Sequence, residues 1–168
     1  IAVSDIAITE ICNQLHFQKT VVLHTSGASS IHLLSQCAKK YGVAWCIYSI
    51  LQNETTDKLD IPFAIEANNA STSELIFELM QSISQNCFEA NEAQRQHLHL
   101  AAVFANNFTN HLIAIAEDIC EVEKIDFKML IPIIQQTFER IKTNKAFALQ
   151  TGPAKRNDAK TMGNISIC

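Results

Sequence analysis

Two clusters of polar side chains in this sequence are placed where they could bind or react with a small molecule. The first is the tetrapeptide His24-Thr25-Ser26-Gly27, which directly follows an apolar segment typical of a buried strand. In open α/β sheets, ligands bind beyond the carboxyl ends of strands, and this turn offers hydroxyls and backbone N–H groups there. The alternative is an ordinary turn that caps a following helix.

The second cluster lies on a long stretch that contains neither Pro nor Gly. Imidazoles and amides stand here among apolar residues, namely His97, His99, Asn106, Asn107, Asn110 and His111. Asn is a poor helix former, so such a concentration needs a reason. Helical spacing puts His99, Asn106 and Asn110 on one stripe. We expect this stripe to face a ligand cleft, with His99 or His111 as proton donor, although a partner helix could occupy it instead.

A third cluster comes late in the chain. The turn Gln150-Thr151-Gly152-Pro153 is followed by Arg156, whose guanidinium could clamp a carboxylate or phosphate. A helix terminator with a surface ion pair is the alternative interpretation. The substrate contacts that we expect are Glu66, Asn107, Gln150, Thr151, Gly152 and Arg156.

The elements that must position these clusters alternate between strand and helix in the first half of the chain. Apolar segments predict strands near 1–4, 21–24, 43–51, 62–67 and 87–90, and helical patterns lie near 5–15 and 29–41. Ser71 and Glu74 form a capping-box pattern, which predicts a helix that runs to about Asn86. This alternation indicates an α/β fold with a largely parallel sheet that is covered on both faces.

From Asn91 onward the patterns are helical only. Asn91 and Gln94 repeat the capping pattern, and a helix is predicted to Val122, about 48 Å long at 1.5 Å per residue. Another follows from Asp126 to about Phe147. We therefore predict two domains, residues 1–90 with the sheet and residues 91–168 all helical. The long helix is too apolar to be covered by one neighbour, which predicts a homodimer.

The composition excludes several function classes. With 48% hydrophobic and 18% charged residues and a net charge of −4, the chain is typical neither of a disordered protein nor of a nucleic-acid binder. No apolar run is long enough to cross a bilayer, so we expect a cytoplasmic protein. The six cysteines form no C-x-x-C pair and predict reduced packing residues without a metal site.

Several segments together resemble one bacterial Rossmann-like family, known as domain of unknown function 2520. They are Ile1-Ala2-Val3-Ser4-Asp5, the His24–Gly27 turn, Ile61–Ala67, Leu98–His111 and Gln150–Ala154. Members look related to pyrroline-5-carboxylate reductase and to deazaflavin-dependent NADP reductases. The resemblance implies a partial Rossmann-like sheet followed by a helical dimerisation domain, and an oxidoreductase that acts on a small carbonyl or imine in an interdomain cleft.

The resemblance also implies a cofactor, NADP or possibly NAD. Its expected contacts in this chain are Ser4, His24, Thr25, Ser26 and Gly27. In the family, the glycine-rich phosphate loop would lie upstream of Ile1, so we expect this chain alone to bind NADPH weakly.

Two departures from related sequences bear on the chemistry. The similar β-hydroxyacid dehydrogenases carry a catalytic Lys four residues before an Asn, and here that pair reads Ala102 and Asn106. A histidine would then have to supply any proton. The segment Trp45–Ser49 also replaces the family's more usual Tyr-Pro-Leu-Gln-Thr-type stretch. A non-catalytic nucleotide-sensing or scaffold dimer with the same fold is the alternative function.

Overall fold

The computed structural model describes residues 1–50, 60–153 and 155–158. The chain divides into two compact units, Ile1–Asn110 and His111–Cys168, and each is described by itself. The functional division into residues 1–90 and 91–168 remains a prediction.

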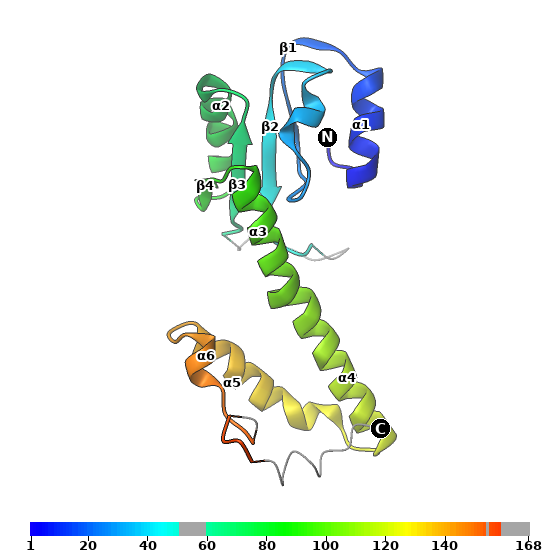
Figure 1. The fold of residues 1–168 in the computed structure, drawn as a ribbon, viewed down its shortest axis with the longest axis vertical. Helices are drawn as coiled ribbons and strands as arrows, with labels where there is room; N and C mark the ends of the chain where they lie inside the picture. Colours follow the sequence, from blue (N-terminus) through cyan, green and yellow to red (C-terminus); the bar gives the residue numbers. More distant parts are fainter. Residues whose placement is uncertain (51–59, 154, 159–168) are drawn as a thin grey trace. The chain divides into compact units, whose positions relative to one another are not determined.

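A four-stranded sheet forms the centre of the first unit (Figure 1). Its strands lie in the order β1 (Phe17–His24), β2 (Ala38–Cys46), β3 (Phe63–Ala67) and β4 (Cys87–Glu89). The pairs β1/β2 and β3/β4 are parallel, whereas β2 and β3 are antiparallel. The predicted class, an α/β sheet followed by helices, is confirmed, with one antiparallel pair in a sheet that is otherwise parallel.

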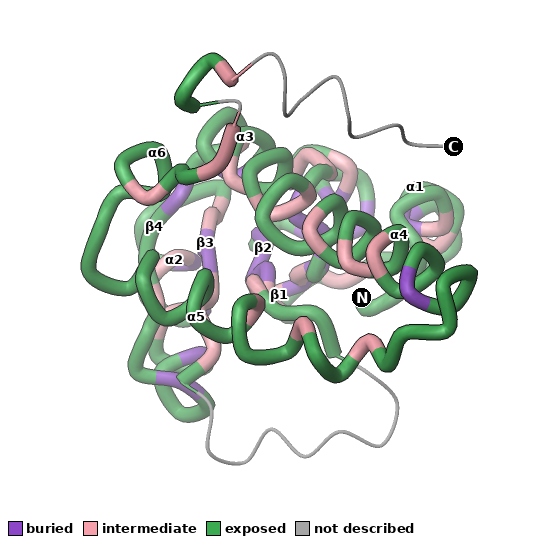
Figure 2. Tube along the Cα trace, turned by 90° about the horizontal axis from the view of Figure 1, so that it is seen from below, coloured by how far each residue is buried: buried purple, intermediate pink, exposed green. Residues whose placement is uncertain are grey.

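Helices cover both faces of this sheet, and four consecutive residues of β2, Gly42–Trp45, are accordingly all buried. Helix α2 (Ala70–Gln81) packs Ile76 and Met80 against Ala44 and Ile65 on one face. The other face carries two buried clusters, one formed with α1 (Asp5–Gln14) and the 3₁₀ helix η1 (Ile31–Leu34), the other with η1 and α3 (Glu92–Ala102). Figure 2 shows the buried residues concentrated on the strands of this unit.

The predicted helix near residues 29–41 is wrong. Only η1 is helical there, and β2 begins at Ala38. The reason is that Tyr41, Val43 and Trp45 are aromatic or β-branched and pack on alternate positions of a strand. Residues 1–4 form no strand, although the amino group of Ile1 donates a hydrogen bond to the carbonyl of Leu23 at 2.6 Å.

Two helix boundaries also differ from those predicted. Helix α2 is capped by Asn69, whose side chain accepts from the Thr72 N–H at 3.0 Å, and it ends at Gln81 rather than near Asn86. The Ser71 hydroxyl donates to the same Asn69 oxygen, so Ser71 supports the cap instead of forming it. The capping box of Asn91 and Gln94 is confirmed, with both of its hydrogen bonds present.

Residues 92–122 are helical, as predicted, but not uniformly α-helical. Helix α3 is followed by the π-helical segment η2 (Val103–Phe108) and by α4 (Thr109–Val122). Asn106 and Asn107 therefore lie on wide turns with i→i+5 hydrogen bonding, whereas Asn110 lies in α4. The pattern of apolar residues does not distinguish a π segment from an α-helix, and the prediction missed it.

In the second unit, the predicted helix 126–147 is divided. It consists of η3 (Phe127–Leu130), α5 (Ile131–Ile141) and α6 (Ala146–Leu149). Gly152 has a φ of 105°, a left-handed conformation that glycine adopts without strain, so the predicted turn after the last helix is confirmed. None of the described helices is long and apolar enough to span a membrane. The five cysteines in the described ranges are free, and Cys168 lies outside them.

Candidate functional site

A groove of about 710 Å³ lies in the first unit, beyond the carboxyl end of β2. One wall is the end of β2 with the residues that follow it, and the other is formed by α3 and η2. Its described lining residues are Trp45, Cys46, Ile47, Tyr48, Ser49, Leu98, His99, Ala101, Ala102, Val103, Ala105, Asn106 and Asn107. A concave site with apolar walls and a few polar groups at the end of a strand is typical of small-molecule binding.

The groove brings together three of the residues that the sequence singled out, His99, Asn106 and Asn107. Asn106 and Asn107 are adjacent in sequence, and both line the groove in the π-helical segment. The Asn106 amide donates to the Asn107 side-chain oxygen at 3.2 Å, so the two amides form one polar unit. Asn110 is not among the described lining residues, which means that the predicted single stripe is divided.

Trp45 connects this groove with the His24–Gly27 turn. Its indole is 8% exposed and lies against the His99 imidazole, with ring centroids 5.6 Å apart and planes inclined by 58°. Gly27 lies directly against the indole, because a Cβ at this position would be only 2.5 Å from the ring. The glycine of the predicted ligand turn is therefore required by the packing of Trp45.

The hydroxyl of Ser26 is used inside its own turn. It accepts hydrogen bonds from the N–H groups of Ala28 and Ser29 and donates to the Ser29 hydroxyl at 3.0 Å. Thr25 is exposed, and Ser4 is exposed at the N-cap of α1 without a side-chain capping bond. Contacts of Ser4, Thr25 and Ser26 with a cofactor remain predictions.

Arg95 is the residue that organises this end of the sheet, and the sequence analysis did not find it. Its side chain is completely buried. The Nε and Nη2 groups donate to one carboxylate oxygen of Glu66 at 3.1 and 2.7 Å. The Nη1 group donates to the carbonyls of Gly27 and Ser29, both at 3.1 Å, and reaches that of Ser26 at 3.5 Å. One guanidinium thus joins α3, β3 and the loop after β1.

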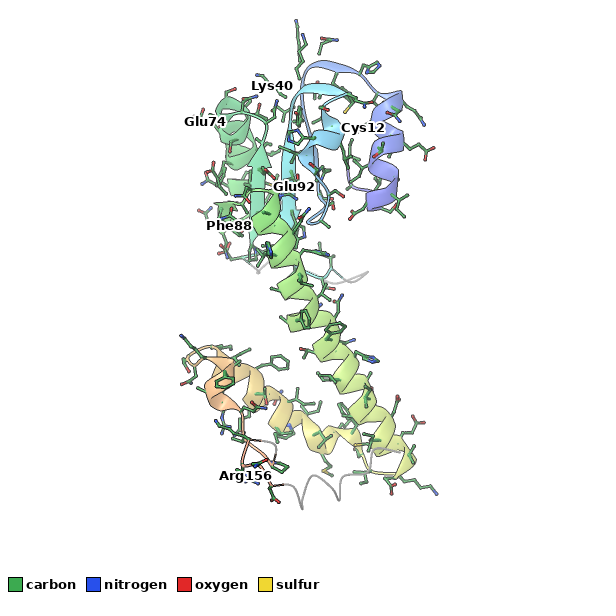
Figure 3. The ribbon with its side chains drawn as sticks, in the orientation of Figure 1. Cys12, Lys40, Glu74, Phe88, Glu92 and Arg156 are labelled. Carbon is green, nitrogen blue, oxygen red and sulfur yellow. The ribbon has the colours of Figure 1, made fainter. Side chains whose placement is uncertain are left out.

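Two further side chains of α3 hold the same loop. Glu92, in the first turn of the helix (Figure 3), accepts a hydrogen bond from the Ser30 hydroxyl at 2.5 Å. Gln96, one turn further along, reaches the carbonyl of Ala28 at 3.5 Å. The loop between β1 and η1 is therefore fixed by side chains from three positions of α3.

Glu66 was expected to contact substrate, and the structure places it in a different environment. It is a neighbour of Val43 in the sheet, and Val43 is in turn the neighbour of His24, so the three form one row across the strands. The Glu66 side chain is 20% exposed and is bonded to Arg95. It does not line the groove beside Trp45. It borders a separate hollow of about 290 Å³ with Asn69, Ser73 and Glu89.

His24, in the same row, is buried completely and is held as a neutral imidazole. Burial is the main cause that lowers its pKa to about 4, and the positive charge of Arg95 lowers it further. Its Nδ1 accepts a hydrogen bond from the Ser26 N–H at 3.2 Å, which puts the remaining proton on Nε2. Within the described part of the chain, Nε2 has no partner. His24 therefore supports the turn as a hydrogen-bond acceptor.

The remaining predicted residues belong to the second unit. His111 begins it, and Gln150, Thr151, Gly152 and Arg156 lie near its end. Arg156 is exposed, and its backbone N–H donates to the carbonyl of Gly152 at 3.4 Å (Figure 3). Their expected roles at a substrate remain predictions. Within the described ranges, no group of His, Cys, Asp and Glu side chains could hold a metal ion.

Two signals in the sequence could have pointed to the missed residues. Arg95 is the one arginine between Ile1 and Phe138, and Glu66 is a carboxylate at the end of an otherwise apolar strand. Charged side chains are rarely buried unless they are paired, so one positive and one negative side chain near the ends of two buried elements indicate an ion pair between them. Trp45 is the single tryptophan of the chain, but its position beside His99 follows only from the fold.

The pKa of His24 predicts an acid-sensitive contribution to folding stability. Below its ordinary pKa of 6.5, the unfolded chain takes up a proton, whereas the folded chain does so only near pH 4. We expect the free energy of unfolding to fall by about 3 kcal/mol as the pH decreases from 7 to 4, and the His24→Gln variant to lack this component. Urea denaturation at several pH values would measure it. The exposed His16→Gln variant is the matched control, and an unchanged slope in His24→Gln would contradict the account.

Comparisons with known proteins agree with this architecture. Putative NADP oxidoreductase BF3122 from Bacteroides fragilis is similar in structure, with a TM-score of 0.89 and 28% identity over 97% of this chain. Protein TM1727 from Thermotoga maritima has a TM-score of 0.73 and 25% identity over 96% of this chain. The chain spans 64% of the length of the first structure and 65% of the length of the second. The match shows that the sheet with its helical part has a Rossmann-like oxidoreductase fold.

The chain matches no protein in a comparison with curated proteins. A family model matches residues 61–164, which is more than half of the 168 residues and includes β3, Arg95 and the Asn-rich π segment. On this match, the protein belongs to the family described as Domain of unknown function (DUF2520).

Proposed function

We propose that this protein is an NADP-dependent oxidoreductase that reduces or oxidises a small carbonyl or imine compound in the groove beside Trp45. The observation that carries the proposal is the meeting of His99, Asn106 and Asn107 in one concave site beyond a strand end. The similarity to a protein named as a putative NADP oxidoreductase supports the same class of reaction. We further propose that the protein is cytoplasmic, which is consistent with the absence of a membrane-spanning helix from the described residues and with the similarity to this oxidoreductase.

The groove fits the nicotinamide end of the proposed cofactor better than the end that carries the phosphates. A nicotinamide ring and a carbonyl substrate are flat and largely uncharged, and the aromatic and amide side chains of the groove suit both. Phosphates need a glycine-rich turn at a helix N-terminus, and the sequence contains no G-x-G-x-x-G pattern. We therefore propose that residues outside this chain bind the phosphates. When bound, the cofactor would supply or accept a hydride.

The side chains of the groove would orient the substrate, transfer a proton and exclude water. Asn106 and Asn107 would hold the substrate oxygen or nitrogen by hydrogen bonds, which fixes the orientation of the reacting carbon. His99, at the wall of the groove, would donate a proton to that atom on reduction and accept it on oxidation. Trp45 and Leu98 exclude water from one side of the site.

The activity is tested with NADPH and a panel of small aldehydes, ketones and cyclic imines, on a protein that also includes the residues proposed to bind the phosphates. We expect Asn106→Ala to lower kcat/KM about 10- to 100-fold, because it removes an orienting hydrogen bond worth about 1–3 kcal/mol. The fold should be unaffected, because Asn106 is exposed and packs little surface. Asn13→Ala, an exposed position on α1, is the matched control. Equal kcat/KM in Asn106→Ala and the parent protein would contradict this site.

One observation favours a second candidate, a nucleotide-sensing protein without turnover. Ala102 lines the groove at the position where similar dehydrogenases carry their catalytic Lys, so the site lacks that proton donor. NADPH binding without oxidation by any member of the substrate panel would support the sensor. NADPH oxidation that depends on His99 would support the enzyme.

We further propose that the protein is a homodimer formed through its second unit. Large apolar side chains there are strongly exposed, including Leu112 at 65%, Val122 at 78%, Met129 at 73% and Phe147 at 86%. An isolated domain rarely leaves so much apolar surface in water. Light scattering at micromolar concentration should give the mass of a dimer, and Val122→Glu should shift it toward the monomer. A monomer at high micromolar concentration would contradict the proposal.

A further inference from the structure

We propose that the groove beside Trp45 selects an uncharged substrate that carries a carboxamide or lactam group, and discriminates against the corresponding carboxylate. This inference rests on the proposed function, since it names the substrate class of the same site. It follows from three features of the groove, namely its charge, its pair of amides and its aromatic wall.

The charge of the groove is the first feature. Among its described lining residues there is no Lys, Arg, Asp or Glu. No Lys or Arg among the described lining residues offers a carboxylate a cation, and the Asn side chains offer too few N–H donors to replace the water that it would lose. An uncharged ligand avoids this cost, so the lining favours neutral molecules over anions.

Arg95, the nearest candidate for an anion partner on α3, is already engaged. It is completely buried, and its donors are used by Glu66 and by the carbonyls of Gly27 and Ser29. Moving this guanidinium toward a ligand would leave the Glu66 carboxylate unpaired and the loop carbonyls unbonded. The Arg95 guanidinium therefore stabilises the fold and is not available to bind a ligand in the groove.

The two amides supply a matched donor and acceptor. Because the Asn106 side-chain nitrogen donates to the Asn107 oxygen, the pair leaves the Asn106 oxygen as an acceptor and the Asn107 nitrogen as a donor. A primary amide or a lactam presents the complementary set, one N–H and one carbonyl on the same edge. A carboxylate presents acceptors only, and it would meet the Asn106 oxygen with an unfavourable contact.

The rings of Trp45 and His99 supply an aromatic wall, in which the two planes are inclined by 58°. They lie 5.6 Å apart by centroid, with Trp45 almost completely buried and His99 at the edge of the groove. Aromatic surfaces of this kind prefer flat, unsaturated ligands in offset or tilted contact. The combination of an aromatic wall and an amide pair favours a planar ligand with an amide edge.

The test uses two probes of the same size, benzamide and benzoate, which differ in charge and in hydrogen-bonding edge. Trp45 is the single tryptophan, so the indole N–H cross-peak of ¹⁵N-labelled protein reports on the groove without assignment of other residues. Both titrations are made in the same buffer at pH 8.5. We expect benzamide to shift this cross-peak with an affinity at least tenfold higher than that of benzoate.

Variants then assign the discrimination to the amide pair. Asn106→Leu should weaken benzamide binding at least fivefold, whereas Asn13→Leu on the exposed surface of α1 should leave it unchanged. Equal affinities for the two probes, tighter binding of benzoate, or unchanged benzamide binding in Asn106→Leu would overturn the substrate class while the groove remains a ligand site. No shift with either probe would overturn the proposed function of the groove as well.

Discussion

The structure of the first unit depends on one buried guanidinium. Burying Arg95 costs several kcal/mol of lost hydration, and this cost is offset only if its charge and its donors are matched. Glu66 supplies the charge, and the carbonyls of the loop after β1 accept the remaining hydrogen bonds. Removing either partner would leave an uncompensated charge in the interior, so α3, β3 and the loop are bound to one arrangement.

The position of the candidate site follows from that arrangement. Because the loop carbonyls are held by Arg95, Gly27 lies against the indole of Trp45, and Trp45 in turn lies against His99. The neutral His24 stabilises the same loop, because its Nδ1 accepts a hydrogen bond from the Ser26 N–H. Arg95 thus shapes the groove through the loop and Trp45, although no Lys, Arg, Asp or Glu stands among the described lining residues.

Much of the first unit could be predicted from the sequence because burial imposes clear patterns on it. The strands at His24, Ile65 and Phe88 and the Asn91 capping box are local features, and all are present. The prediction of a helix at residues 29–41 was wrong. The sequence pattern there also suits a helix, but the packing of Tyr41, Val43 and Trp45 in the sheet outweighs it.

The candidate site was predictable only in part. Asn residues within a helical stretch are costly, and this pointed to the π segment and to Asn106 and Asn107. Arg95 and Trp45 were missed because their importance comes from partners 29 residues or more away in sequence, Glu66 for the one and His99 for the other. The expected contact of Glu66 with a substrate stays a prediction, and its bond to Arg95 could not be predicted because a lone carboxylate does not reveal its partner.

The central claim is that Arg95 holds the loop which places Trp45 beside His99, and the nuclear Overhauser effect between those two rings tests it most directly. The effect should be present in the parent protein and in Lys142→Met, which removes an exposed ion pair with Glu139. In Arg95→Met, measured where circular dichroism shows a folded chain, the account predicts that the effect is lost and that the amides of residues 26–30 exchange faster. A folded Arg95→Met variant with an undiminished Trp45–His99 signal would contradict the account.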